Sequence, residues 1–397
     1  MSLLAAANCA NADEFVVQLR LTAPLLSEDE AVYVTGSGMQ LANWRPDVHR
    51  MQHAGGHAWS FDLKLPSRQM LEYKYTLGSW SREGADNQGK PLPNFRREVA
   101  GAVVIEDRIE RWTKPRPRET SGQITGSVRY HRKVSHPELR DRDVVVWLPP
   151  DYAESSDRYP VLYMQDGQNL FDPTTSAFGV DWQIDEACTR LIQQQAIAPL
   201  IVVGIYNTPE RSREYLLGEQ AGTYRQFVID VIKPLVDQEY RTKPDRQHTL
   251  AGGSSAGGLC AFVLAWEHAD VFSKAICMSP AFRFESADAA LSVDYVATVA
   301  AAARPNHELS FYVDNGGTGV DEQLQPGVEA MIEVLRSKGF REGEDLRYFH
   351  DPDAPHNEAA WAKRFPAAIA RLLQPTDVSA ETKEIQAQPA SATCLNE

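Results

Sequence analysis

The sequence lacks long hydrophobic runs: none approaches the length of about 18 residues that a membrane-spanning helix needs. We therefore expect no transmembrane helix and no membrane partner. Residues 1–12 also lack the basic start and the apolar core of a signal peptide. Positive charge is scarce, since 40 Lys and Arg residues stand against 54 Asp and Glu residues and give a formal net charge of −14. Such a chain repels phosphate backbones, so we expect no nucleic-acid partner.

Cysteine is scarce as well, and the five residues of this type cannot all pair. Two of them fall near the ends of the chain, and the other three fall in apolar segments. This usage predicts free thiols in a reducing compartment and hence a cytoplasmic protein. A signal peptide trimmed from this sequence would instead indicate a periplasmic or secreted protein. The cysteines are Cys9, Cys188, Cys260, Cys277 and Cys394.

The remaining composition, 43% hydrophobic and 24% charged, is typical of a soluble chain with two domains. Residues 13–107 show short alternating strands between turns, which predicts a small all-β sandwich. Residues 108–125 are rich in proline and charge and predict a linker. Strands and helices alternate over residues 126–375, which predicts a mainly parallel sheet covered by helices on both faces. The segments 1–12 and 376–397 are predicted to be tails, the second a disordered one.

The sequence from Gly253 to Gly257 reads Gly-x-Ser-x-Gly, which is the pattern of a nucleophile elbow. It follows a strand-like segment and opens a helix-like one, as the elbow requires. A serine that projects from so tight a turn tolerates almost no side chain beside it, and this explains the glycines. Centring the pattern on Ser254 would put Ala256 in the last glycine position, so the pattern selects Ser255 as the nucleophile.

A nucleophilic serine needs a histidine base, and the base needs an acid that orients it. In an α/β-hydrolase these residues follow in the order serine, acid, histidine. His356 follows the last predicted strand and precedes the last helix, so it is the predicted base, with His350 in reserve. The acid is expected in the loop after residues 311–313. Asp321 is favoured there, with Asp314 and then Glu322 as alternatives.

The negative oxygen that forms during acyl transfer needs two backbone N–H donors. One donor is predicted to be Ala256, which follows the nucleophile. The other is expected in the loop 165–172 after an earlier strand, where Gly167 permits a turn. Gln168 is the favoured second donor, and the amide of Asn169 is the alternative.

Further residues are expected at the carboxyl edge of the sheet as substrate-binding groups. Arg211 and Arg213 follow a strand and offer positive charge to an anionic or catecholate group. The alternative for either arginine is a structural salt bridge, for example to Asp166. Asp166 and Asn169 belong to the same loop as the predicted oxyanion donor. Phe282 is expected to form a wall of the acyl pocket in a cap over residues 281–303.

Four segments together resemble the esterase D and enterochelin esterase-like branch of the α/β-hydrolases. This branch includes feruloyl and acetyl-xylan esterases, siderophore esterases and mycolyl acyltransferases, so the resemblance implies acyl-ester chemistry without fixing the ester. It also implies that no metal and no cofactor take part. Many relatives carry His-Gly where this chain has Asp166-Gly167, which implies a pocket of different charge. The segments are Leu148–Tyr152, Tyr159–Asp172, the elbow, and His356–Glu358 with Trp361.

The first domain resembles the starch-binding family of carbohydrate-binding modules, which have an immunoglobulin-like sandwich. In such modules exposed tryptophans stack on sugar rings. The resemblance implies that Trp44 and Trp80 bind carbohydrate; the alternative is that both pack the ends of the sandwich. The matching pieces are Val32–Gly36, Leu41–Trp44, Trp59, Leu65–Pro66, Glu72–Tyr75, Gly78–Trp80 and Pro93–Asn94.

Together these observations predict a serine carboxylic ester hydrolase of the α/β-hydrolase fold, preceded by an all-β immunoglobulin-like sandwich. The expected substrates are acetyl or feruloyl-type esters of carbohydrates. A siderophore lactone is the second choice of substrate. An acyltransferase with the same residues and a non-catalytic glycan-binding protein are the alternatives of other classes. The expected partners are a small-molecule or oligosaccharide ester and a glycan, and the sequence leaves the oligomeric state open.

Overall fold

The computed structural model of the chain describes residues 15–37, 39–65, 68–113, 124–177, 179–285 and 292–373. The predicted tails, residues 1–12 and 376–397, lie outside the described residues. So does most of the predicted linker.

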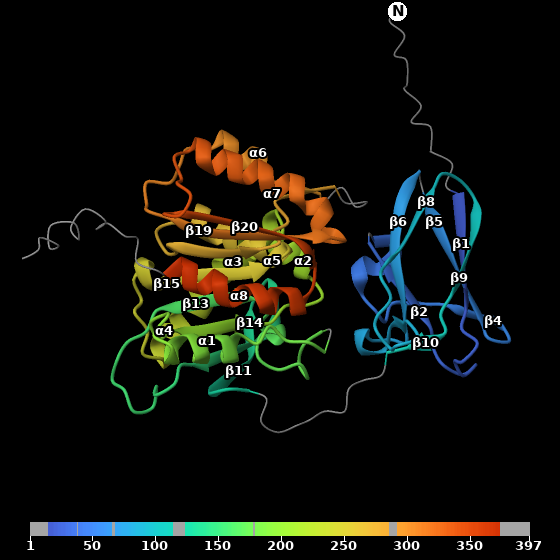
Figure 1. The fold of residues 1–397 in the computed structure, drawn as a ribbon, viewed down its shortest axis with the longest axis horizontal. Helices are drawn as coiled ribbons and strands as arrows, with labels where there is room; N and C mark the ends of the chain where they lie inside the picture. Colours follow the sequence, from blue (N-terminus) through green and yellow to red (C-terminus); the bar gives the residue numbers. More distant parts are fainter. Residues whose placement is uncertain are drawn as a thin grey trace, which may run out of the picture.

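The first domain is a sandwich of two four-stranded sheets, with the strand orders β4-β5-β1-β9 and β3-β2-β6-β8 (Figure 1). Alternate residues of the strands point inward, and the core between the sheets contains Trp59, Tyr73 and Tyr75. The predicted sandwich is therefore confirmed. Its strands are β1 (Phe15–Thr22), β2 (Tyr33–Gly36), β3 (His49–Arg50), β4 (Gln52–Gly55), β5 (Ala58–Leu65), β6 (Gln69–Thr76), β8 (Phe95–Val99) and β9 (Val103–Arg108), with short 3₁₀ turns η1 (Met39–Trp44) and η2 (Trp80–Arg82).

The sandwich continues past the predicted boundary at residue 107. Strand β10 (Arg111–Trp112) pairs with β7 (Gly84–Ala85). Ile109 between β9 and β10 is buried in the core of the sandwich. The linker therefore starts later than predicted. Charge and a nearby proline suggested a solvated segment at residues 108–112, but one buried isoleucine and one short strand pair hold it to the sandwich.

The second domain is built on an eight-stranded sheet with the order β11-β12-β14-β13-β15-β16-β19-β20. The six strands from β14 to β20 in this order are parallel to one another, whereas β12 pairs in antiparallel fashion with both of its neighbours, β11 and β14. The predicted mainly parallel sheet is confirmed. The strands are β11 (Ser127–His136), β12 (Leu139–Leu148), β13 (Val161–Gln165), β14 (Ile201–Ile205), β15 (Thr249–Ser254), β16 (Lys274–Met278), β19 (Ser310–Thr318) and β20 (Leu346–Pro355), with a small hairpin of β17 (Arg283–Phe284) and β18 (Val293–Asp294).

Helices cover both faces of this sheet, and a separate apolar core lies on each face. Helices α1 and α8 pack on one face, where Cys188 and Phe365 join the core (Figure 1). The other helices pack on the opposite face, and α5 is buried along almost its whole length. The helices are α1 (Ile184–Gln193), α2 (Arg211–Tyr215), α3 (Glu219–Phe227), α4 (Lys233–Glu239), α5 (Ala256–Glu267), α6 (Tyr295–Ala301), α7 (Val320–Ser337) and α8 (Glu358–Leu373), with the short 3₁₀ turns η3 (Gly167–Asn169) and η5 (Arg246–His248) and the π-helical segment η4 (Val228–Ile232) that joins α3 to α4.

The parallel strands all end at one edge of the sheet, and the loops that leave this edge carry the candidate site. The elbow follows β15, the η3 turn follows β13, and His356 follows β20.

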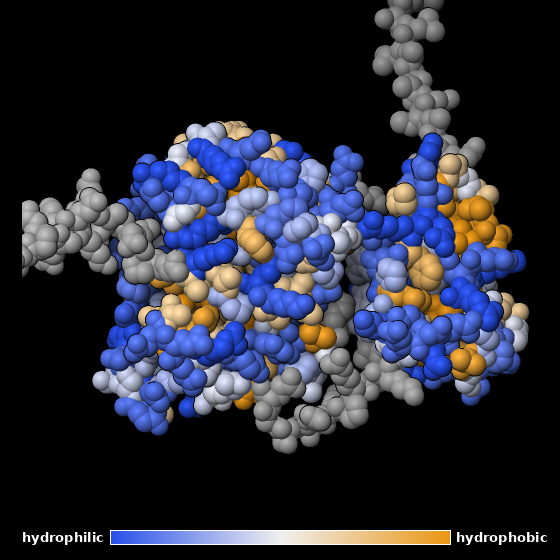
Figure 2. All heavy atoms as spheres, in the orientation of Figure 1, coloured by the Kyte–Doolittle hydropathy of each residue, from blue (hydrophilic) through white to orange (hydrophobic). Residues whose placement is uncertain are grey.

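The visible surface is mainly hydrophilic, and apolar atoms gather on the sandwich over β1 (Figure 2). Val16, Val103 and Val104 on the adjacent strands β1 and β9 are each more than 40% exposed. Within the described residues, no helix is long and apolar enough to cross a bilayer.

Candidate active site

Ser255 lies at the sharp turn between β15 and α5, with φ 57° and ψ −125°. A positive φ is costly for a residue with a side chain, and its presence here means that the surroundings impose it. A Cβ on Gly253 would lie 2.5 Å from the carbonyl oxygen of Gly257, so only glycine fits there. The Ser255 N–H donates to the carbonyl of Met278 at 2.9 Å, and the N–H of Ala281 donates to the Ser255 carbonyl at 3.1 Å. The chain around the predicted nucleophile is therefore fixed on both sides.

The structure places His356 against Asp321, with 2.7 Å between Nδ1 of the histidine and Oδ1 of the aspartate. The Asp321 side chain is completely buried, whereas that of His356 is 15% exposed. The indole of Trp361 meets the imidazole edge-on, with ring centroids 5.0 Å apart. A carboxylate on Nδ1 fixes the proton on that nitrogen and leaves Nε2 as the basic atom. This is the arrangement that a general base requires.

Asp321 does not lie in a loop, as predicted, but in the first turn of α7. The helix N-terminus favours its negative charge. Its second oxygen accepts hydrogen bonds from the Gly316 N–H at 3.1 Å and from the Ser279 hydroxyl at 3.2 Å. These bonds and the contact with His356 hold the Asp321 carboxylate in one orientation.

The alternative residues lie elsewhere. Asp314 is fully buried and pairs with Arg364 at 3.1 Å. Burial raises the pKa of Asp314 to about 6 even though Arg364 opposes this shift. Glu322 and His350 are exposed, the latter on β20. The structure therefore brings Asp321 to His356 and leaves the three alternatives out.

Ser279 and Arg364 help to orient the acid Asp321, and neither residue was predicted. Ser279 contacts Asp321 directly, and Arg364 contacts Ser279. The Ser279 hydroxyl accepts from Trp361 Nε1 at 3.1 Å and from Arg364 Nη2 at 2.9 Å, so its only proton goes to Asp321. Ser279 has a φ of 44°, the second strained serine at this edge. The sequence signal was weak, because Ser279 is marked only by its place after a strand and Arg364 only by its place in a helix.

The Ser255 hydroxyl makes no hydrogen bond to the described residues. Its side chain and that of His356 are both partly exposed at the same edge of the sheet. Catalytic hydrogen bonds are often long in a free enzyme and shorten when substrate binds.

The predicted oxyanion loop lies directly against the elbow. A Cβ on Gly257 would be 3.3 Å from Oδ2 of Asp166, which precedes η3. Gly167 packs on the backbone of Gly204, where a Cβ would come within 2.5 Å of backbone atoms. Ala256 is the first residue of α5, so its N–H has no partner within the helix. Gln168 lies in the middle of η3, and its side-chain oxygen accepts from the Asn207 N–H at 3.1 Å.

Arg211 binds Asp166 with two hydrogen bonds of 2.7 Å each. Of the two roles considered for Arg211, substrate binding and a structural salt bridge, the structure shows the salt bridge. The Asn207 amide donates to the same carboxylate at 2.6 Å and was not predicted. The Arg211 side chain remains 30% exposed, but its charge is neutralised by Asp166. Arg213 is 64% exposed and has a loose ion pair with Glu210 at 3.9 Å.

Glu358 is a buried carboxyl group beside this pair. It accepts from the Asn169 side chain at 3.3 Å and has no ion pair among the described residues. Burial and the nearby charge of Asp166 raise the pKa of Glu358 to about 8, although Arg211 opposes the shift. The motif His356–Glu358 carried the family resemblance, but Glu358 was not predicted as a site residue.

The prediction that Phe282 lines an acyl pocket is wrong. Its side chain is completely buried and packs on Phe262, with ring centroids 5.0 Å apart. The segment after Ser279 turns into the core between α5 and α6 before it reaches the surface. A phenylalanine in an apolar segment is more often a core residue than a ligand contact, and Phe282 is a core residue.

Trp44 and Trp80 lie together on the sandwich, as two partly exposed rings with centroids 6.3 Å apart and planes 39° apart. Trp44 ends η1 with a φ of 63°, and Trp80 begins η2. Two turns from distant parts of the chain thus present one aromatic surface.

Two family models match the sequence. The model of the starch binding domain matches residues 14–90. Over 100 residues the chain is 29% identical to an amylopullulanase of Thermoanaerobacter thermohydrosulfuricus, a match of 24% of this chain and 7% of that protein. Over 202 residues it is 23% identical to an endo-1,4-beta-xylanase/feruloyl esterase of Xylanibacter ruminicola, a match of 49% of this chain and 25% of that protein. The chain thus spans only a small part of these relatives.

Solved structures share the fold. A ferulic acid esterase covers 63% of this chain, and 98% of its own length, with a TM-score of 0.51 and 19% identity. The enterobactin esterase of Shigella flexneri covers 91% of this chain, and 94% of its own length, with a TM-score of 0.53 and 14% identity. The second family model, that of the putative esterases, matches residues 137–372, which contain the elbow, Asp321 and His356, and the chain therefore belongs to the putative esterase family.

Proposed function

We propose that this protein is a serine carboxylic ester hydrolase that removes acetyl or feruloyl-type acyl groups from carbohydrates. The observation that carries the proposal is the 2.7 Å bond between His356 and the buried Asp321, at the sheet edge where Ser255 occupies a strained elbow. The family membership supports the same chemistry.

In the proposed reaction the Ser255 oxygen attacks the ester carbonyl carbon while its proton passes to Nε2 of His356. The N–H groups of Ala256 and Gln168 stabilise the negative oxygen that forms. When the intermediate collapses, the sugar hydroxyl leaves with the proton held by His356, and the acyl group stays on Ser255. Water then gives a proton to His356 and attacks the acyl-enzyme, which releases the acid and restores the serine. Asp321 stabilises the imidazolium in both halves.

Two observations favour a sugar ester over a siderophore lactone. The paired rings of Trp44 and Trp80 lie on a domain that matches the starch binding family. At the catalytic edge, Asp166 neutralises Arg211, so this arginine offers no uncompensated charge to an anionic catecholate. The feruloyl esterase relative and the similar ferulic acid esterase structure support the same substrate class.

The test is hydrolysis of a panel made up of p-nitrophenyl acetate, methyl ferulate, an acetylated xylo-oligosaccharide and a catecholate trilactone. We expect the wild type to prefer a sugar or feruloyl ester, and Ser255→Ala to lose activity and labelling by a fluorophosphonate. Asp321→Asn should lower kcat by about 10⁴-fold, because it leaves His356 with the wrong tautomer. Glu322→Gln is the matched control, since it changes the exposed neighbouring carboxylate, and it should keep full activity.

Each outcome separates the alternatives. Preference for the trilactone would identify a siderophore esterase that uses the same residues. New sugar esters formed in the presence of acceptor sugars would identify an acyltransferase. A wild type that cleaves no ester and fails to label would contradict the proposal and leave a glycan-binding protein.

A further inference from the structure

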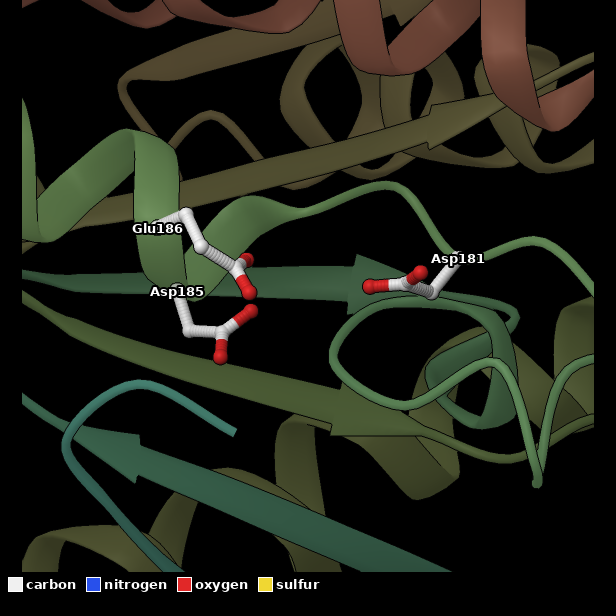
Figure 3. Close-up of side chains that lie close together, drawn as sticks. All are labelled: Asp181, Asp185 and Glu186. Atoms are coloured by element: carbon white, nitrogen blue, oxygen red, sulfur yellow. The ribbon is translucent and has the colours of Figure 1, made fainter. Parts of the chain in front are cut away.

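Three carboxylates gather where the chain enters α1, and none of them takes part in the proposed reaction. Asp181, Asp185 and Glu186 each offer one oxygen, and these oxygens all lie within 4.8 Å of one another. Figure 3 shows the three side chains directed toward a common point between the loop and the helix. Asp181 and Asp185 are buried, at 2% and 0% exposure.

This cluster has no compensating cation of its own. Among the described residues, no Lys, Arg or His side chain forms an ion pair with any of the three. One Asp185 oxygen accepts the Thr125 N–H at 2.6 Å, and one Asp181 oxygen accepts the Gln183 N–H at 3.2 Å. The other Asp185 oxygen, Oδ1, is buried and has no hydrogen-bond partner, and the same is true of Oε2 of Glu186. A buried polar atom without a partner is costly, so each such atom requires an explanation.

Asp185 and Glu186 lie in the first turn of α1, but this position does not explain their unpartnered oxygens. A helix N-terminus stabilises acidic side chains that remain in water, but Asp185 is fully buried and its free oxygen is directed into the cluster. Three carboxylates whose oxygens lie this close together repel one another when charged, and a bound cation relieves that repulsion.

We propose that Asp181, Asp185 and Glu186 bind a calcium ion. Calcium takes six to eight oxygen ligands at about 2.3–2.6 Å, so two of its ligands are at most about 5 Å apart. The oxygens of this cluster lie within 4.8 Å of one another and so stay inside that limit. The donor set contains only oxygen, which favours a hard cation over zinc or copper. Bidentate carboxylates and water would complete the coordination.

The ion would stabilise the loop that supports the catalytic edge. Asp181 is followed by Trp182, whose N–H donates to the Asn169 carbonyl at 2.8 Å, and Ile184 binds the Leu170 carbonyl at 3.2 Å. The Trp182 ring packs on Trp361 at 5.4 Å, and Trp361 packs on His356. Thr125, which shortly precedes β11, is bound to the same Asp185 through its backbone N–H. Calcium would therefore hold the start of the domain, α1 and the oxyanion loop together, whatever ester the enzyme cleaves.

The test compares the melting temperature of the full chain after chelator treatment and after addition of Ca²⁺ or Mg²⁺. At a Ca²⁺ concentration about 100-fold above Kd, the wild type should melt about 5–10 °C higher than the chelated protein, and Mg²⁺ should do less. Asp185→Asn and Glu186→Gln should abolish this difference, whatever their own stability. Glu219→Gln is the matched control, because it removes an exposed first-turn acid from α3 and should leave the response to Ca²⁺ intact.

Terbium provides a second measurement that does not depend on the variants folding well. Tb³⁺ should bind the wild type with luminescence excited through the neighbouring Trp182, and Ca²⁺ should displace it. A wild type with the same melting temperature in chelator and in Ca²⁺, and with no displaceable Tb³⁺ signal, would overturn the proposal. In that case the cluster holds shared protons instead of a cation.

Discussion

Glu358 has the most strongly perturbed carboxyl group beside the catalytic edge, and its protonation should be visible in the stability of the protein. Its pKa is about 8 in the folded state and 4.5 in the reference state. Below the lower value the carboxyl is protonated in both states. Between these values the unfolded chain loses the proton while the folded chain keeps it, so stability falls as the pH rises.

We expect Glu358→Gln to remove this contribution, since glutamine keeps an acceptor for Asn169 and does not titrate. Relative to the variant, the wild type should lose up to about 1.4 kcal/mol of unfolding free energy per pH unit between the two pKa values. Urea unfolding of both proteins over this pH range measures the difference. Parallel stability curves would show that Glu358 is charged in the folded protein.

At the residue scale, the sequence predicted the nucleophile and the base, because the chemistry of acyl transfer requires particular residue types in a particular order. The elbow pattern selected Ser255, and chain order after the last strand selected His356. The sequence offers no decisive reason to favour Asp321 over Asp314 as the acid. Only the tertiary structure shows that Asp314 forms an ion pair with Arg364. Chain position suggested that Phe282 and Arg211 contact the substrate, but the structure buries Phe282 against Phe262 and pairs Arg211 with Asp166. Which way each side chain points depends on neighbours such as Phe262 and Asp166, which are distant in sequence.

At the scale of elements, the pairing of β19 with β20 determines where the acid and the base meet. The two strands shift register between Gly316 and Thr318. A Cβ on Gly316 would lie 2.2 Å from the Asp321 carboxylate and 2.3 Å from the Ala354 carbonyl. The glycine therefore provides room for the hydrogen bond that its own N–H gives to Asp321.

We expect Gly316→Ala to displace Asp321 or β20, and thereby His356. Activity should fall by about 100-fold, since a shift of about 1 Å in a catalytic group has an effect of this size. Overpacking should lower the unfolding free energy by about 1–3 kcal/mol. Gly222→Ala is the matched control, because a Cβ there meets nothing within 4 Å in α3. The control should keep its activity and gain up to about 1 kcal/mol of stability. Equal activity in both variants would contradict the argument.

The elements that the sequence predicted are those with strong periodicity. The helix that the elbow opens and the helix that follows His356 were both expected from the sequence, and the structure shows them as α5 and α8. Two other strands carry no such signal in the sequence. Most residues of β11 are partly or fully exposed and many are polar, and β8, Phe95–Val99, is mostly charged. Such strands exist because a neighbouring strand offers hydrogen bonds, and this partner is invisible in a local pattern.

At the scale of the whole molecule, two sites on different domains have to act on one substrate if the proposed function is right. The Trp44–Trp80 surface would hold the glycan, and the edge with Ser255 would cleave its ester. Binding by the sandwich would raise the local concentration of esters on an insoluble polysaccharide, but it would not change the chemistry on a small soluble ester. The two roles are therefore separable by mutation.

We expect Trp44→Ala and Trp80→Ala each to weaken binding of soluble malto-oligosaccharide by at least about tenfold, the loss typical of an aromatic hot spot. Titration calorimetry measures this effect. Val104→Ala, which shortens an exposed apolar side chain on the other sheet, is the control and should bind normally. Hydrolysis of p-nitrophenyl acetate should be the same in all four proteins. If the tryptophan variants bind the sugar as well as the wild type does, the rings pack the end of the sandwich, and the preference for sugar esters would rest on the catalytic domain alone.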